Sequence, residues 1–252
     1  MEIIQFLALE IALPLGIVAL IHFKLSKYPE PLPLEGSKLK GIWEALIIWA
    51  LSVVVLTVIV FSDLAEKMAD PTPGILLQFI LITGVPYLLI PVLYMTLVKK
   101  WTLKDFGFRK PVPNSLSVII FAVIIHAIYG TLPILAPGFS PTPVLMLIFA
   151  LYQPAFIEEF FFRGVIQGNL ERVLGQNKAW IYGGILFGLL HFGFNYFIAD
   201  LDLVSGIFRL GGQIIAGWMF GILYMKTRSL WPGMFVHYFV NSNLASIITM
   251  IS

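Results

Sequence analysis

Three charged residues stand inside one of the most apolar stretches of the chain, PAFIEEFFFRGVIQG at residues 154–168. Glu159 and Arg163 are four residues apart, so on a helix their side chains share a face and can form an ion pair. Such a pair largely neutralises two charges that would each be costly in an apolar medium. Glu158 points about 100° away from that pair and has no partner along its own helix. We therefore expect Glu158 to face a cavity or another helix, where its carboxylate is available for chemistry.

Two of the four histidines share one polar pattern, a histidine followed four residues later by an asparagine. The pairs are His191 with Asn195 and His237 with Asn241, and each pair lies on one face of its predicted helix. Phe187 adds an aromatic ring one turn before His191. A single histidine in an apolar helix is more often a core residue. Two such pairs together with a free glutamate favour a functional site, because ionisable groups within a membrane mark such sites by default.

These side chains can carry out peptide-bond hydrolysis without a covalent enzyme intermediate. The Glu158 carboxylate and the His191 imidazole can orient and deprotonate a water molecule for attack on a carbonyl. His237 and Asn241 can donate hydrogen bonds to the oxyanion that develops. We expect no cofactor and no metal in this mechanism.

A zinc site is an alternative use of the same residues. Glu158, His191 and His237 resemble a set of two histidines and one glutamate that binds zinc. Against it, the chain has no H-E-x-x-H motif, and the two histidines are 46 residues apart on different predicted helices.

The elements that must position these residues are predicted to be membrane-spanning helices. The chain is 59% hydrophobic, whereas soluble domains have roughly 45–50% apolar residues. Apolar runs long enough to span a bilayer recur along it. The absence of cysteine excludes disulfides, thiol catalysis and cysteine metal sites, and no basic tract suggests nucleic acid.

The predicted fold class is all-α: a polytopic membrane protein whose bundle of about eight transmembrane helices encloses an intramembrane polar cavity. We expect one transmembrane domain over residues 1–252, with the motif-bearing core at about 143–250. The predicted segments run approximately over residues 3–23, 42–61, 75–98, 115–134, 143–163, 179–197, 207–225 and 231–250. Gly184 with Gly188, and Gly217 with Gly221, are spaced for close helix packing.

The distribution of basic residues predicts the orientation. Between these segments, 14 of the 16 lysines and arginines fall on one side, which the positive-inside rule makes cytoplasmic. At about 1.5 Å per residue from the cytoplasmic ends of the predicted segments, Glu158 lies ~8 Å deep, His237 ~9 Å and His191 ~18 Å. We therefore expect a cavity in the cytoplasmic half of the bilayer that opens to the cytosol. The membrane would be the cell membrane of a prokaryote or the endoplasmic reticulum of a eukaryote.

Three motifs occur in order on three of these segments. They are E-E-x-x-x-R at 158–163, F-x-x-x-H-x-x-x-N at 187–195 and H-x-x-x-N at 237–241. In this order they resemble the CPBP family, which comprises the CAAX prenyl protease type 2 and bacteriocin-processing group, also called abortive-infection proteins. The resemblance covers about the last 100 residues.

The resemblance implies a bundle of eight transmembrane helices with an intramembrane glutamate protease site. It implies that Glu158 and His191 activate water and that His237 and Asn241 form the oxyanion hole. The supporting residues would be Glu159, Arg163, Asn195 and Phe187. In the CAAX branch of the family, the substrate is a prenylated C-terminal C-a-a-X peptide, from which three residues are removed.

Two other classes of function remain open at this point. The protein could hold a membrane peptide in the same cavity without cutting it, as an immunity or scaffold factor. A transporter with a polar site at the midplane is less favoured, because we find no internal repeat. His126 and Glu10 lie deep in apolar segments, and the sequence assigns them no role.

Overall fold

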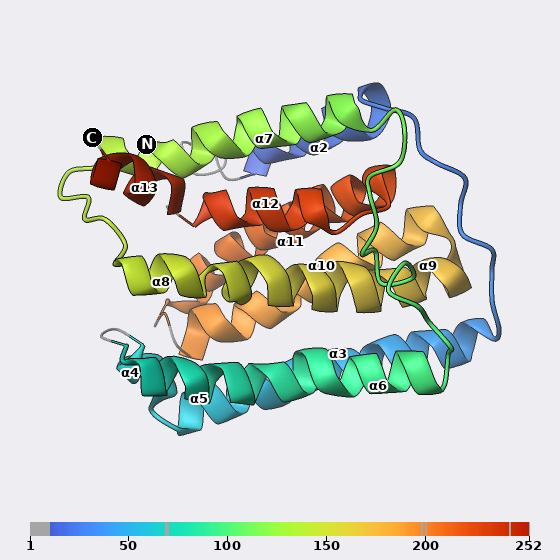
Figure 1. Ribbon diagram of the computed structural model, residues 1–252, viewed down its shortest axis with the longest axis horizontal. Coiled ribbons are helices and arrows are strands. Elements are labelled where there is room, and N and C mark those ends of the chain that lie inside the picture. The colour runs from blue at the N-terminus through green and yellow to red at the C-terminus, as the bar shows by residue number, and fades with distance from the viewer. Residues whose placement is uncertain (1–10, 69–70, 198, 200, 242, 252) are drawn as a thin grey trace.

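The protein is helical throughout the part that the structure, a computed structural model, describes. That part comprises residues 11–68, 71–197, 199, 201–241 and 243–251, so Glu10 lies outside it. Figure 1 shows the long helices running side by side along one axis, with their connections gathered at the two ends of the bundle. This arrangement confirms the predicted class, an all-α bundle of apolar helices.

Five helices in the described part are long and apolar enough to cross a membrane. Two of them are single helices, α3 (Lys38–Phe61) and α11 (Leu203–Thr227). The other three are built from consecutive pieces: α5 (Pro73–Gly84), η2 (Val85–Leu89) and α6 (Ile90–Leu97); α7 (Leu116–Thr131) and η3 (Leu132–Leu135); and α8 (Val144–Phe149), η4 (Leu151–Phe156), η5 (Glu159–Gln167) and α9 (Gly168–Leu174). A four-residue helix, α4 (Leu64–Lys67), lies between α3 and α5.

The predicted count of about eight spanning helices is not confirmed. α2 (Leu13–Lys24) is a 12-residue apolar helix, and the earlier part of its predicted segment lies outside the described residues. α10 (Gln176–Phe197) has 22 residues, but it is absent from the set of five, since its glycines, histidine and amide side chains lower its hydropathy. The last predicted segment is broken into α12 (Trp231–Val240) and α13 (Asn243–Ile251), which bend by 67°.

Helices α10 and α11 pack closely, with two glycines facing each other. A Cβ atom added to Gly217 would lie 2.8 Å from the Cα and carbonyl oxygen of Gly184. The side chain of Trp218 also packs against Gly184. Only residues without a Cβ allow two backbones to approach so closely. The structure thus confirms the packing predicted from the glycine spacing.

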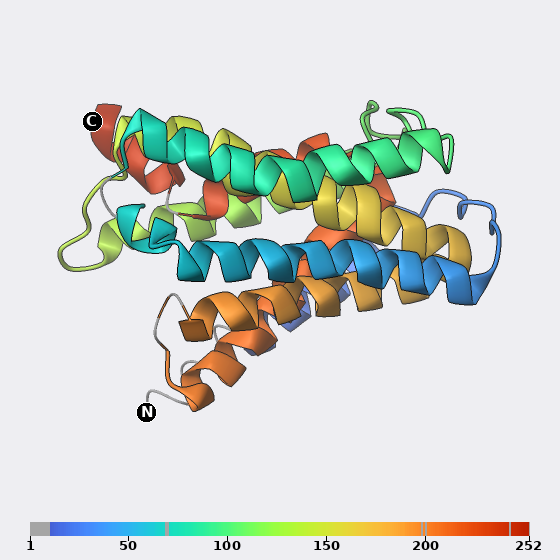
Figure 2. The ribbon, with the colours of Figure 1, turned by 90° about the horizontal axis from the view of Figure 1, so that it is seen from below.

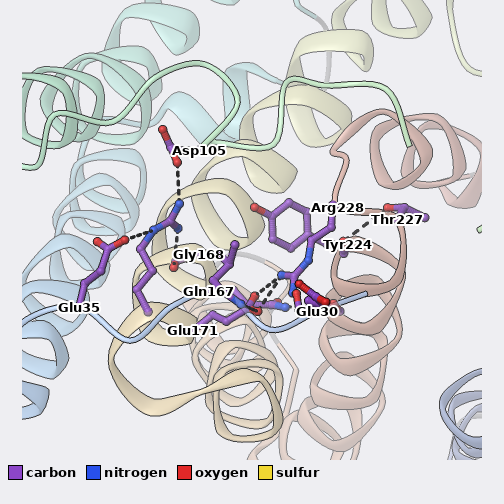
Figure 3. A network of polar contacts seen from close by, with 12 residues as sticks. Glu30, Glu35, Asp105, Gln167, Gly168, Glu171, Tyr224, Thr227 and Arg228 are labelled. Atoms are coloured by element: carbon purple, nitrogen blue, oxygen red, sulfur yellow. Dashed lines mark hydrogen bonds and ion pairs between the residues drawn. The ribbon is translucent and has the colours of Figure 1, made fainter. Parts of the chain in front are cut away.

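Ion pairs connect the loops and helix ends at one end of the bundle (Figure 3). Arg228 donates to both carboxylate oxygens of Glu171, at 2.7 Å each. Arg172 donates to Asp105 at 2.8 Å and lies 3.6 Å from the Glu35 carboxylate. These contacts fix the two long loops, residues 25–37 and 98–115, to the ends of α9 and α11.

The same end carries most of the basic residues, and we call it the basic end. Lys226 at the end of α11 donates to the backbone carbonyls of Leu25 and Ser26, at 2.6 and 2.7 Å. Burial alone would raise the pKa of the Asp105 carboxyl, but hydrogen bonds from Thr102 and the positive charge of Arg172 lower it. The carboxylate of Asp105 is therefore ionised at neutral pH and remains paired with Arg172.

Candidate active site

Glu158 lies in the long composite helix, just before η5, and its carboxylate faces three polar side chains. Gln153 donates from Nε2 to Oε1 of Glu158 at 2.7 Å. The other oxygen, Oε2, lies 3.9 Å from Nε2 of His191 and 3.9 Å from Nε2 of His237. The structure thus brings together one carboxylate and two imidazoles that are 33 to 79 residues apart in the chain.

The prediction that Glu158 has no partner along its own helix is wrong. Its partner Gln153 is five residues earlier, a spacing that does not share a face on a regular helix. The helix is interrupted at Gln153, whose backbone is extended at φ −123° and ψ 117°. Pro154 follows, and a residue before proline is driven away from the helical conformation. The interruption makes the helical spacing rule inapplicable here.

His191 presents an unprotonated nitrogen to Glu158 when the imidazole is neutral. Its Nδ1 lies 2.9 Å from the carbonyl oxygen of Phe187, which can only accept, so Nδ1 carries the proton. Nε2 is then an acceptor that faces a second acceptor, Oε2 of Glu158, at 3.9 Å. Two acceptors at this separation suit a water molecule that donates one hydrogen to each.

His237 is held by the second glutamate of the motif. Its Nδ1 lies 2.9 Å from Oε1 of Glu159, and the carboxylate accepts a hydrogen bond from the Nδ1–H group. The imidazole stacks on Phe220, with ring centroids 4.6 Å apart. These two contacts fix the ring so that Nε2 is the nitrogen directed towards Glu158.

The expected ion pair between Glu159 and Arg163 is present, with Nε of Arg163 3.6 Å from Oε2 of Glu159. The guanidinium is fully enclosed, 4.4 Å from the ring centroid of Phe187 and 5.3 Å from that of Phe220. Arg163 also donates from Nη2 to the carbonyl oxygen of Gly217 at 3.3 Å. Arg163 therefore connects the motif helix to α11 while it balances the charge of Glu159.

The two asparagines of the repeated pattern lie in different surroundings. Asn195 exchanges two hydrogen bonds with Gln213 of α11, at 2.8 and 3.2 Å, and is buried. Asn241 lies at the end of α12, where the chain bends, and lines a cavity next to Glu158. Asn195 thus fixes α10 against α11, whereas Asn241 is exposed to whatever enters the cavity.

That cavity has a volume of about 460 Å³. Its polar lining residues include Gln153, Glu158, His191 and Asn241. Most of the remaining wall is apolar, and includes Val55, Leu56, Ile59, Phe79, Met146, Phe149, Leu190 and Phe194. A cavity of this kind fits an apolar ligand that places a polar group against the carboxylate and imidazole.

The cavity extends to the end of the bundle opposite the basic end. Its wall includes Met68, Thr142 and Asn243, which belong to the connections near α4, α8 and α13. Figures 1 and 2 show these elements at one end and the loops 25–37 and 98–115 at the other. We call the end near α4, α8 and α13 the mouth end.

The depth predicted for Glu158 is wrong, because the helix end from which it was counted is misplaced. Hydropathy ended the fifth segment at Arg163, but the composite helix continues to Leu174. Arg163, Glu171 and Arg172 are buried and paired, so they do not mark an exposed helix end. Glu158 consequently lies near the middle of this helix.

Two other polar residues near the site, Gln153 and His126, have no role predicted from sequence. Gln153 precedes a proline within an apolar run. This position is the one sequence signal that could have indicated a role for Gln153 in the site. His126 is buried with Nδ1 at 2.6 Å from the carbonyl oxygen of Ala122, and its ring is 5.5 Å from that of Phe220. Phe220 contacts the rings of both His126 and His237.

Residues 140–243 match the model of the family described as type II CAAX prenyl endopeptidase Rce1-like. The matched range contains all three sequence motifs and every residue named above as part of the site except His126 and those of the apolar wall contributed by α3, α4 and α5. This match confirms the resemblance to the CPBP family. The family and the apolar helices together fit a multi-pass membrane protein of the protease class. Comparisons with curated proteins and with solved structures gave no match.

Among the residues that the structure describes, no three histidine, aspartate or glutamate side chains form a group that could hold a metal ion. The zinc alternative nevertheless involves the same three side chains as the hydrolytic site. The effect of a chelator on activity distinguishes the zinc site from the metal-free hydrolytic site.

Proposed function

We propose that the protein is an intramembrane endopeptidase in which Glu158 and His191 activate a water molecule. The observation that carries the proposal is the position of Oε2 of Glu158, 3.9 Å from both imidazole Nε2 atoms and next to the cavity. The water gives a proton to the carboxylate or to His191 as its oxygen attacks the peptide carbonyl. The same group returns the proton to the leaving amine.

His237 and Asn241 stabilise the oxyanion of the tetrahedral intermediate. Because Nδ1 of His237 donates to Glu159, the ring donates to the oxyanion when Nε2 is protonated as well. The carboxylate of Glu159 balances the charge of that imidazolium, and Arg163 keeps the carboxylate in place. Asn241 supplies the second donor from the bend after α12.

The substrate that the family match suggests is the C-terminal tail of a prenylated CAAX-type protein, from which the last three residues are removed. The largely apolar wall of the cavity supports this proposal, because it offers an isoprenoid chain a surface beside the polar groups. Partition of a lipid chain into the bilayer contributes about 0.8 kcal/mol per buried CH₂. The lipid would therefore provide much of the binding free energy.

We expect removal of the lipid to raise KM sharply, with a smaller effect on kcat, because binding by the lipid is equal in ground and transition states. The measurement is cleavage of one peptide with and without its isoprenoid by purified protein in liposomes. Equal kcat/KM for the two peptides would exclude lipid-directed recognition. The same assay in the presence of a chelator tests the zinc alternative, which would be established by loss of activity that added zinc restores.

A second substrate is favoured by the position of the mouth end. A prenylated CAAX tail is anchored in the cytoplasmic leaflet, so it requires the mouth to face the cytosol. The positive-inside rule instead places the basic end in the cytosol and the mouth end on the other face. In that orientation the substrate would be a membrane-anchored peptide presented from the non-cytoplasmic side, cut by the same chemistry.

A further inference from the structure

We infer that Gln153 belongs to the reacting site: its amide nitrogen orients Glu158, and its amide oxygen accepts an N–H from the peptide that is cut. This inference rests on the proposed function of Glu158 as the group that activates water. Gln153 lies outside the three sequence motifs. It reaches the site because the composite helix is interrupted at this residue.

The amide nitrogen decides which oxygen of Glu158 takes part in the reaction. A carboxyl group rotates easily about its last torsion angle, so its two oxygens exchange places unless something holds them. Nε2 of Gln153 donates to Oε1 at 2.7 Å, a short and strong hydrogen bond to a charged acceptor. Oε2 is thereby left at 3.9 Å from both imidazoles.

The orientation of the Gln153 amide follows from this contact. If the amide were turned by 180°, its oxygen would lie against the carboxylate, and two acceptors would repel each other. With the nitrogen directed towards Glu158, the amide oxygen Oε1 of Gln153 does not take part in that hydrogen bond.

The amide oxygen is a buried acceptor beside the cavity. In the part of the chain that the structure describes, neither Oε1 of Gln153 nor Oε2 of Glu158 accepts a hydrogen bond from a protein group. Burying such an acceptor without a donor costs free energy. A peptide that enters the cavity brings backbone N–H donors, and Gln153 is one of the residues that line this cavity. A backbone N–H next to the scissile bond would donate a hydrogen bond to this oxygen, while the carbonyl of the scissile bond lies near Glu158.

Two substitutions separate the two halves of the inference. Gln153→Glu keeps an oxygen that can accept from the substrate but places a second carboxyl group against Glu158, and carboxyl groups this close share one proton. We expect kcat at neutral pH to fall by roughly 10- to 100-fold, with KM little changed, and the acidic limb of the kcat profile to move to higher pH. In Gln153→Met the side chain keeps a similar shape but can bond neither Glu158 nor the substrate. We therefore expect KM to rise and kcat to fall.

Tyr152→Phe is the matched control, because Tyr152 is the preceding residue in the same interruption. Its hydroxyl bonds Thr83 at 2.9 Å and the carbonyl of Ile80 at 3.3 Å, and it does not touch Glu158. The control should keep the pH profile of the unmodified protein. A Gln153→Glu variant whose profile coincides with that of the unmodified protein would overturn the inference.

A measurement without substrate tests the contact with Glu158 independently of proteolysis. In Gln153→Glu the folded state holds the shared proton more tightly than the unfolded chain does. The loss of Tm relative to the unmodified protein should therefore grow as pH rises from 5 to 8. In Tyr152→Phe the difference in Tm should not depend on pH. If Gln153→Glu also shows a pH-independent difference, the contact is refuted, whereas full activity of a Glu158→Gln variant refutes the proposed function instead.

Discussion

The two adjacent glutamates have different surroundings. Glu159 is hydrogen-bonded to His237, whereas Glu158 lies 3.9 Å from both His191 and His237. Glu158 borders the cavity, whereas Glu159 is buried between His237 and Arg163. In the proposed mechanism Glu159 acts through another residue, because it fixes the ring of His237.

Replacing Glu159 should cost stability more than replacing an exposed glutamate. Glu159→Gln leaves the buried guanidinium of Arg163 without its counter-charge, and breaking a buried pair costs roughly 3–5 kcal/mol. The measurement is chemical unfolding in detergent. Glu66→Gln is the matched control, since Glu66 in α4 is exposed. Equal stability of the two variants would contradict the structural role of Glu159.

Sequence alone predicted which residues meet but not every contact among them. The spacing of Glu159 and Arg163 gave their pairing, because i,i+4 spacing applies wherever the helix is continuous. The contact of Gln153 with Glu158 could not be predicted, since it depends on where the helix is interrupted. Asn195 and Asn241 have the same spacing from histidine, yet only tertiary structure shows that one pairs with Gln213 and the other lines the cavity.

At the scale of elements, two interruptions shape the site. One is at Gln153 in the composite helix, and the other is at the end of α12, where Asn241 lies. Both were predicted as positions within continuous segments, because hydropathy averages over a window and does not resolve a change of backbone direction. The apolar composition was sufficient for the fold class, but not for helix ends, since Arg163, Glu171 and Arg172 are charged and buried at once.

The contact between α10 and α11 should be sensitive to a single methyl group. Gly217→Ala places a Cβ 2.8 Å from backbone atoms of Gly184, which cannot move aside without separating the helices. We expect a lower Tm and lower activity, because α10 carries His191 and the carbonyl of Gly217 binds Arg163.

The control for this prediction is Gly206→Ala on the same helix. A Cβ there would meet Phe192 at 3.6 Å, an ordinary contact, so the better helix propensity of alanine should keep or raise Tm. If Gly217→Ala is as stable as Gly206→Ala, the close approach of the two helices is not required.

At the scale of the whole molecule, the basic end and the mouth end are opposite. The basic loops are fixed by ion pairs such as Arg172 with Asp105, while the cavity reaches the other end. Sequence predicted them on one side, because the depth of Glu158 was counted from Arg163, whereas its helix continues to Leu174. The orientation of the bundle in the membrane thus decides which class of anchored peptide reaches Glu158.

Single cysteines can show the two faces directly, because the chain has no native cysteine. Lys104→Cys lies in an exposed loop at the basic end, and Ser140→Cys lies in an exposed loop at the mouth end. We expect a membrane-impermeant maleimide to label the two variants from opposite faces of sealed, oriented vesicles. Labelling of both from the same face would contradict the arrangement. Labelling of Ser140→Cys from the cytoplasmic face supports a prenylated tail, and labelling from the other face supports the second substrate.

Cleavage by a Glu158→Gln variant tests the central claim most directly. Purified protein in liposomes is given a prenylated peptide or, for the second substrate, a peptide anchored on the mouth side, and the release of its tail is followed. We expect the unmodified protein to cleave and Glu158→Gln to lose at least about a hundredfold in kcat, while its Tm shows that it remains folded. Cleavage by Glu158→Gln at the rate of the unmodified protein would contradict the assignment of Glu158 as the residue that activates water.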